Sequence, residues 1–160
     1  MPASPEDARI TADPHGQWAS VAEASSSYTP TKYGPMQAAG GPKVVSYGDY
    51  ADAWASRTED GQEEWLKLAY ATPVPAVGVR VRQTFNPGAV SKVEVFSADG
   101  RSAVVWSGQD TTAYEKNKIV WFSVTFAPPP FPVQSVKLTI NSAAVKGWNE
   151  IDAVQLVGSP

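Results

Sequence analysis

Hydrophobic and polar residues alternate along most of the second half of the chain. The segment 76–84 is the clearest case, because Val77, Val79 and Val81 alternate with Arg80 and Arg82. A period of two is typical of an antiparallel strand with one face in the core and the other toward solvent. The same kind of pattern predicts strands over 64–70, 91–97, 102–108, 119–126, 133–141 and 151–158.

Turn signals separate these segments. Asn86-Pro87-Gly88 and Pro128-Pro129-Pro130 interrupt the pattern, and Ala98-Asp99-Gly100 favours a tight hairpin. A looser alternation of small and apolar residues over 18–27 predicts a first strand, which brings the total to about eight. No strand is followed by a helical pattern long enough for a βαβ unit. The sequence therefore predicts an all-β, antiparallel sandwich.

Two segments lack this alternation. Residues 1–16 hold three Pro, several charges and the only His, so we expect a flexible lead-in, with the folded domain spanning 17–160. Residues 28–63 form a long irregular stretch in which 36–39 favour one helical turn. A loop of this length in a compact domain is usually functional or held by an ion.

Length and charge narrow the class of protein. The 160 residues suit one domain with a full hydrophobic core. The net charge of −3, from 13 basic and 16 acidic residues, gives no footprint for nucleic acid and no basic patch for a membrane surface. No stretch is apolar for long enough to insert into a membrane. Cys is absent, which excludes disulfides and thiolate chemistry.

The start of the chain bears on localisation. Residues 1–13 are polar and lack an apolar run, so no signal peptide is predicted there. A cytoplasmic protein and a domain of a longer secreted protein both agree with this. We expect the second, an extracellular or cell-surface domain.

Three stretches carry a family resemblance. They are Ala53–Ser56 with Glu64–Leu68, then Val77–Val95 around Asn86-Pro87-Gly88, and last Gly147–Leu156. Together they resemble the galactose-binding-like superfamily, which includes discoidin (F5/8 type C-like) domains and carbohydrate-binding modules. The likeness is greatest to modules of large bacterial proteins. The resemblance implies a jelly-roll sandwich but little about the ligand, because this fold hosts many functions.

The resemblance also implies a structural calcium ion. Many family members hold Ca²⁺ between the long first loop and a Glu that starts the last strand, here Glu150. The family loop often reads D-G-N-x-x-T-x-W, and Tyr47 stands at its first Asp when Trp54 is aligned. The carboxylates of Asp49 and Asp52 could compensate, so the predicted metal ligands are Asp49, Asp52 and Glu150. The alternative is that these residues only form turns and hydrogen bonds.

Carbohydrate modules of this fold usually bind their ligand on loops at one end of the sandwich. Aromatic faces pack on the sugar ring, while polar side chains hold its hydroxyl groups. We expect the tryptophans at 54, 65, 106 and 121 to pack in the core, and the loop tyrosines at 28, 33 and 114 are further aromatic candidates. The predicted ligand-binding residues are Tyr47, Tyr50, Arg82, Phe85, Asn86, Trp148 and Asn149.

Catalysis is disfavoured. His15 lies in the predicted lead-in, which argues against a His general base or a Ser-His-Asp triad. Glu150 and Asp152 share a strand face and could in principle act as a carboxylate pair in glycoside hydrolysis, but such a pair at the start of a strand is more often structural. A small hydrolase is therefore the last-ranked interpretation.

The sequence thus predicts a non-catalytic module that binds a glycan through its loops. The alternative is a protein-interaction or scaffold module of the same fold. Neither the ligand nor the oligomeric state follows from the sequence.

Overall fold

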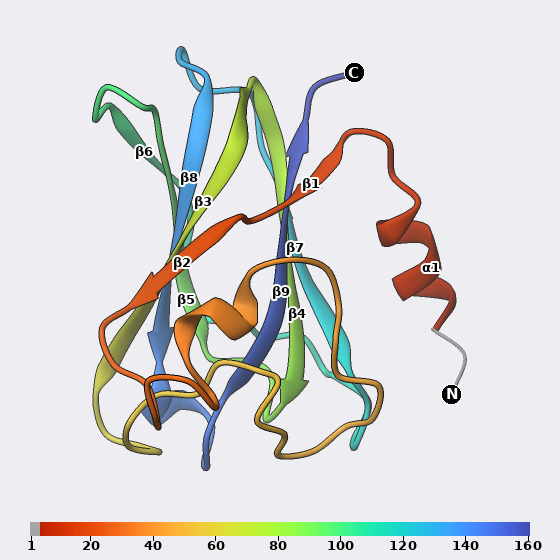
Figure 1. Ribbon diagram of the computed structural model, residues 1–160, viewed down its shortest axis with the longest axis vertical. Coiled ribbons are helices and arrows are strands. Elements are labelled where there is room, and N and C mark those ends of the chain that lie inside the picture. The colour runs from red at the N-terminus through yellow and green to blue at the C-terminus, as the bar shows by residue number, and fades with distance from the viewer. Residues whose placement is uncertain (1–3) are drawn as a thin grey trace.

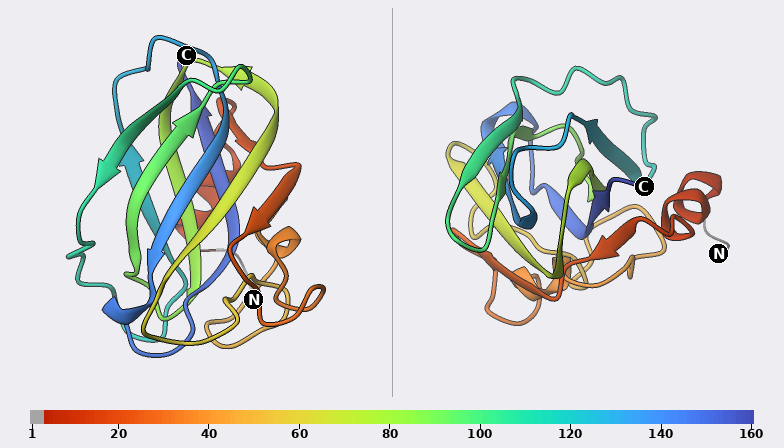
Figure 2. Two further views of the ribbon diagram at one scale, coloured as in Figure 1. Left: turned by 90° about the vertical axis from the view of Figure 1, so that its left-hand side faces the viewer. Right: turned by 90° about the horizontal axis from the view of Figure 1, so that it is seen from above.

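Two antiparallel sheets form the molecule in the computed structural model, which describes residues 4–160 (Figure 1). One sheet has the strand order β1-β9-β4-β7, and the other has β2-β3-β8-β5-β6. The view from above shows the two layers enclosing a common interior (Figure 2). The predicted antiparallel β-sandwich is confirmed. The strand bounds are β1 Gly16–Trp18, β2 Val21–Ala24, β3 Glu63–Val74, β4 Ala76–Phe85, β5 Val90–Phe96, β6 Ser102–Ser107, β7 Val120–Thr125, β8 Val133–Asn141 and β9 Glu150–Gly158.

The predicted alternation produces the core between the sheets. On β3, Leu66 and Leu68 are fully buried, and on β4 the same holds for Val79 and Val81. Burial of such side chains contributes about 1.5–3 kcal/mol each, so alternation in register across both sheets stabilises the sandwich. Trp65 instead lies half-buried on the outer face, with the Lys137 ammonium 5.3 Å from its ring centre.

The predicted first strand differs from the structure. Instead of one strand over 18–27, β1 pairs with β9 in one sheet and β2 pairs with β3 in the other. Ala19 and Ser20 carry the chain across, and the Ser20 N–H already donates to the Ala69 carbonyl of β3. This crossing explains why nine strands form where about eight are predicted.

The expected flexible lead-in also differs. Helix α1 spans Pro5–Thr11 and begins with a capping box, in which Ser4 and Asp7 each accept a hydrogen bond from the other's backbone N–H. Pro5 suits the first helical turn. Ile10 is fully buried, and its carbonyl accepts a hydrogen bond from Gln155 of β9. Tertiary contacts therefore hold a short helix that is marginal alone; residues 1–3 lie outside the described residues.

The long loop between β2 and β3 is held by a tryptophan. Trp54 is fully buried, its backbone pairs with Ile151 of β9, and its indole N–H donates to the Ser26 carbonyl at 2.9 Å. The predicted helical turn is present as the 3₁₀ helix η1 (Pro35–Ala38). A second 3₁₀ helix, η2 (Ser142–Ala144), precedes β9. Within residues 4–160, no helix has the length and apolarity that a membrane crossing requires.

Four connections gather at one end of the sandwich, at the bottom of Figure 1. They are the long loop, the turn after β4, the β6–β7 connection and the segment before β9. We call this region the loop end; its residues are 25–62, 86–89, 108–119 and 142–149.

Candidate functional site

The loop end brings most of the predicted ligand-binding residues together. Asn86 lies at their centre. Its side-chain amide donates to the Trp148 backbone carbonyl at 2.9 Å, and its backbone carbonyl accepts from the side-chain amide of Asn149 at 2.8 Å. Its backbone has φ 46°, a left-handed conformation that Asn tolerates. Asn86 and Asn149 therefore join two loops, and their amides are engaged within the protein.

Gly147 makes this junction possible. Its φ is 90°, and a Cβ atom added there would lie 2.6 Å from the Asn86 amide nitrogen. Both facts require glycine, because a side chain would be strained and would displace Asn86.

A cleft of about 330 Å³ opens beside this junction. Tyr47 and Tyr114 contribute aromatic surface, and the Tyr47 ring packs on Phe85 with centroids 5.5 Å apart. The exposed residues Lys116 and Asn117 supply charged and amide groups at the rim. We call this space the Tyr47 cleft. Apolar walls with a few polar groups are typical of small-molecule sites, whose volumes begin near 300 Å³.

A second, smaller cavity of about 100 Å³ is lined by Trp148. Tyr28 stands nearly perpendicular to both other aromatic rings, with centroids 5.3 Å from Tyr33 and 5.6 Å from Trp148. The carboxyl groups of Asp49 and Glu150 complete the lining. We call this space the acidic cage; it is lined by Tyr28, Tyr33, Asp49, Ala55, Trp148 and Glu150.

The two carboxyl groups of the cage differ in environment. Glu150 is 1% exposed; its Oε1 accepts the Tyr50 N–H at 3.1 Å, whereas its Oε2 is buried without a hydrogen-bond partner among the described residues. Burial raises the pKa of Glu150 to about 8; the Tyr50 N–H opposes this shift, and the Asp49 carboxylate adds to it. Asp49 is exposed and accepts a 2.6 Å hydrogen bond from the Tyr33 hydroxyl, which raises the pKa of Tyr33 to about 12.

The three predicted metal ligands do not converge. Asp49 and Glu150 share the cage, but Asp52 lines a different hollow together with Lys43 and Tyr50. No three His, Cys, Asp or Glu side chains within residues 4–160 are grouped for a metal. Ca²⁺ requires six to eight oxygen ligands. The donors that face the two carboxyl groups are an N–H and a phenol, so these side chains do not fit the calcium site that the resemblance implies.

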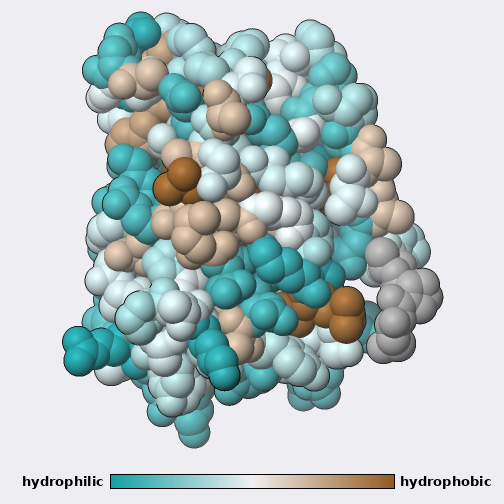
Figure 3. Space-filling view, in the orientation of Figure 1, coloured by the Kyte–Doolittle hydropathy of each residue, from teal (hydrophilic) through white to brown (hydrophobic). Residues whose placement is uncertain are grey.

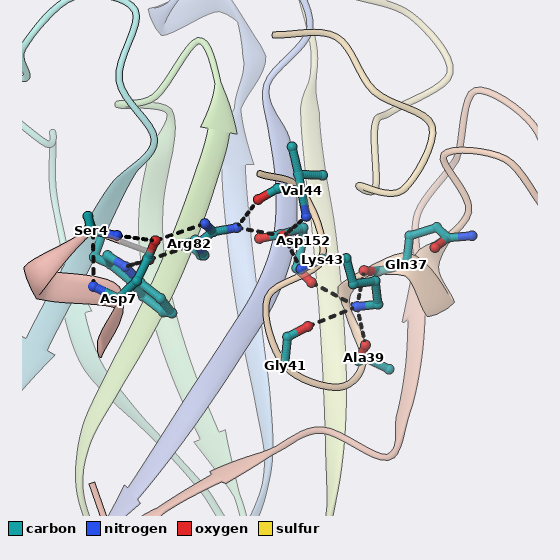
Figure 4. Close-up of polar contacts among 10 residues, drawn as sticks. Ser4, Asp7, Gln37, Ala39, Gly41, Lys43, Val44, Arg82 and Asp152 are labelled. Atoms are coloured by element: carbon teal, nitrogen blue, oxygen red, sulfur yellow. Dashed lines mark hydrogen bonds and ion pairs between the residues drawn. The ribbon is translucent and has the colours of Figure 1, made fainter. Parts of the chain in front are cut away.

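Arg82 is placed differently from the prediction. It is 4% exposed, and its guanidinium makes two 3.0 Å hydrogen bonds to the Asp7 carboxylate (Figure 4). A third nitrogen donates to Asp152 at 2.8 Å and to the Val44 carbonyl at 2.7 Å. Arg82 does point away from the interior of the sandwich, but α1 and the loop after η1 cover it. These contacts engage the Arg82 guanidinium within the protein.

The same cluster fixes the long loop to β9. One oxygen of Asp152 accepts the backbone N–H groups of Lys43 and Val44, and the Lys43 ammonium donates to the carbonyls of Gln37, Ala39 and Asp152 (Figure 4). We call Asp7, Lys43, Arg82 and Asp152 the Arg82 network. Burial raises the pKa of Asp7, but hydrogen bonds from Arg82 and Trp121 outweigh it, so the pKa is lowered overall.

A hollow of about 750 Å³ adjoins this network between α1, residues 42–47 and residues 117–119. Apolar surface shows at the lower right of the space-filling view, where Figure 1 places the loop after η1 (Figure 3). Val45 of this loop is 68% exposed. The Asp7 and Arg82 groups in its wall are bonded to each other. We therefore select the loop end as the candidate site.

Several residues of the site are not among the predicted ligand-binding residues. Tyr28 and Tyr33 are recognisable as loop aromatics, but only the pairing of Tyr28 N–H with Ala55 and of Tyr33 N–H with Ala51 brings them to Trp148. That pairing leaves no periodic signal. Asp7 was also missed, although its spacing from Ser4 is that of a capping box.

The tryptophans expected in the core divide by environment. Trp54 and Trp121 are buried, and Trp106 packs edge-on against Phe122 at 4.8 Å. Trp148 is half-buried and donates its indole N–H to the Ser56 carbonyl, which leaves ring surface in the cage.

Comparisons with known proteins agree with this architecture. The family described as "Pappalysin-1, SD scarf domain, C-terminal" matches residues 9–160. F-box/LRR-repeat protein 4 of Bos taurus is 28% identical over 105 residues, which cover 60% of this chain but only 17% of that protein. The chain thus corresponds to about a sixth of this curated relative.

Solved structures give the same fold at low identity. Selenomethionine-labelled chitosan-binding module 1 from a Paenibacillus sp. IK-5 chitosanase/glucanase has a TM-score of 0.63 at 15% identity, covering 86% of this chain and 93% of the other. The family 32 module of NanJ from C. perfringens, in complex with galactose, has a TM-score of 0.62 at 15% identity, covering 88% of this chain and 98% of the other. An F5/8 type C domain from Bacteroides fragilis has a TM-score of 0.60 at 13% identity, covering 92% of this chain and 99% of the other. These likenesses confirm the predicted galactose-binding-like fold.

Proposed function

The chain belongs to the family of the C-terminal SD scarf domain of pappalysin-1, and we propose that it is a non-catalytic module that binds a carbohydrate through the Tyr47 cleft. The observation that carries the proposal is the composition of this cleft. Tyr47 and Tyr114 supply ring faces for the C–H surface of a sugar, and Lys116 and Asn117 supply hydrogen-bond donors for its hydroxyl groups.

Two further observations support this class of function. Structures of the same fold include a chitosan-binding module and a module in complex with galactose, both at 15% identity. His15, the only His of the chain, lies where its carbonyl accepts the Gly158 N–H, at the end of β9 away from the loop end. No His therefore reaches the cleft as a general base.

The proposed context is a longer extracellular or cell-surface protein in which this module holds a glycan near the rest of the chain. Localisation of the full-length protein at the cell surface is the expected result, and retention in the cytoplasm would contradict this part of the proposal.

Calorimetry with galactose-type and glucose-type oligosaccharides tests the proposal. Tyr47→Leu removes a ring face from the cleft and is expected to weaken binding by about tenfold or more, within the range of hot-spot aromatics. Tyr50→Leu is the matched control, because Tyr50 is 46% exposed at the loop end but does not line the cleft. Lys116→Ala, which removes a charge from the cleft, is compared in the same way with Lys118→Ala, which removes a charge outside it.

If the wild-type protein bound no glycan of a broad panel, carbohydrate binding would be rejected. The scaffold interpretation would then be favoured, and the apolar surface around Val45 would be the first candidate for a protein-binding surface.

Calcium is tested separately. Because only two of the three predicted carboxylates meet, we expect EDTA and added Ca²⁺ to leave the melting temperature unchanged. A calcium-dependent rise would instead restore the structural ion that the resemblance implies.

A further inference from the structure

The acidic cage contains an acceptor that the protein does not satisfy. Glu150 lines the cage and is 1% exposed, and its buried Oε2 has no hydrogen-bond partner among residues 4–160. A buried polar atom left in this state costs free energy, and such atoms are rare in folded proteins. The cage is open to solvent, since Tyr28 is 54% exposed and Asp49 is exposed. A ligand can therefore enter the space that Glu150 lines.

The charge of the cage is also unbalanced. Neither Asp49 nor Glu150 forms an ion pair with a Lys or Arg of the described chain. Glu64 is another buried glutamate, near the start of β3, and it differs because the hydroxyl groups of Ser25 and Ser26 donate to it. The cage thus lacks a positive group.

The walls of the cage suit a cation. Tyr28 stands at 79° to Tyr33 and at 81° to Trp148, so the three rings form adjoining sides of a box. Aromatic faces attract cations that lie within about 6 Å of the ring centre, and Trp and Tyr are the strongest of these rings.

Size and hydrogen bonding define the cation further. A volume of about 100 Å³ holds roughly three water molecules at about 30 Å³ each, which suits one substituent and not a whole sugar ring. A quaternary ammonium has no N–H and would leave Oε2 unsatisfied. A primary ammonium has three N–H donors and can reach both carboxyl groups.

We propose that the acidic cage binds the protonated primary amine of an amino sugar, so that the ligand of this module is a glycan with unacetylated amino groups. This inference rests on the carbohydrate binding proposed above and adds a second contact point beside the Tyr47 cleft. An N-acetyl group removes the positive charge and leaves one N–H donor in place of three.

Calorimetry with glucosamine oligomers and N-acetylglucosamine oligomers of equal length tests the proposal. It is carried out near neutral pH, because acid would keep the Glu150 carboxyl, whose pKa is about 8, protonated and uncharged. We expect the unacetylated oligomers to bind at least tenfold more tightly. Glu150→Gln keeps the acceptor for the Tyr50 N–H but cannot ionise to a carboxylate when the ammonium binds, so the preference should disappear. Glu64→Gln is the matched control and should keep it. Tyr28→Leu should weaken the amine-bearing ligand severalfold, whereas Tyr28→Phe should not.

Each contrary result has a distinct meaning. Equal affinity for the two oligomers, or a preference that survives in Glu150→Gln, overturns the amine site and leaves carbohydrate binding standing. No binding of any glycan overturns both. A rise in melting temperature with Ca²⁺ that is lost in Glu150→Gln also overturns the inference, because the cage would then be a metal site.

Discussion

At the scale of single residues, the main lesson comes from Arg82. Alternation along β4 correctly predicts that its side chain leaves the interior of the sandwich, but alternation carries no information about what covers the outer face. Here Asp7, from a segment 75 residues away in sequence, meets the guanidinium through two parallel hydrogen bonds. This bidentate geometry is the strong form of an Arg–carboxylate pair. A residue expected to bind ligand therefore stabilises the fold.

Removal of the Asp7 charge tests this role. Asp7→Asn places an amide N–H₂ against Arg82 and leaves part of a buried guanidinium unpaired, so we expect a loss of about 3 kcal/mol in the free energy of unfolding. Asp13→Asn breaks the more exposed pair with Arg80, whose side chains are 19% and 20% exposed, and should cost less than about 1 kcal/mol. Urea denaturation of both variants measures the difference. Equal small losses would contradict a stabilising role of Asp7.

The pKa of Asp7 also predicts a pH dependence. Its folded pKa is lowered by Arg82 and Trp121 despite burial, so it lies below the unfolded value of about 3.9. The stabilisation is complete above about pH 5 and is lost as the pH falls through the folded pKa. Asp7→Asn should make the free energy of unfolding depend less steeply on pH below about pH 5. Parallel curves for wild type and variant would contradict this; some slope remains in both, because the pKa of Asp13 is lowered too.

At the scale of elements, the strands could be predicted from the sequence, but the helix and loops that pack over the sheets could not. The alternating apolar residues of β3, β4 and β8 predict which face of each strand is buried, because every second side chain packs against the opposite sheet. α1 has a capping box and a proline start, but only seven residues, so its stability depends on the sheet that it covers. The cage depends on pairing between residues 28–33 and 51–55, which no local pattern reports.

A truncation on α1 tests whether this helix is part of the domain. Ile10→Ala removes a fully buried side chain and should cost about 2–4 kcal/mol of the free energy of unfolding. Arg9→Ala, one position earlier on the exposed face, should change it by less than about 0.5 kcal/mol. Denaturant titration measures both. A flexible lead-in would instead give two values near zero.

At the scale of the whole molecule, a rigid sandwich supports an irregular end. Trp54, Asn86 and the Arg82 network attach the loops to β4 and β9, so the loop end is positioned before any ligand arrives. A preformed site loses less conformational entropy on binding. Ligand binding should therefore add directly to the stability of the fold.

Mass action gives the size of this effect. A glycan at 100 times its Kd should stabilise the protein by about 2.7 kcal/mol, which corresponds to a rise of roughly 5–10 °C in melting temperature for a domain of this size. Differential scanning fluorimetry measures the rise, and Tyr47→Leu at the same glycan concentration should show little of it. A rise of equal size in the variant would place the ligand outside the Tyr47 cleft.

The direction of β9 has a practical consequence for such measurements. The strand starts at the loop end with Glu150 and finishes at Gly158, so the C-terminus emerges at the opposite end of the sandwich (Figure 1). A tag or partner fused after Pro160 therefore points away from the Tyr47 cleft and the acidic cage. Immobilisation through that tag presents both openings to a polymer in solution, whereas attachment through the N-terminus would hold the support beside α1.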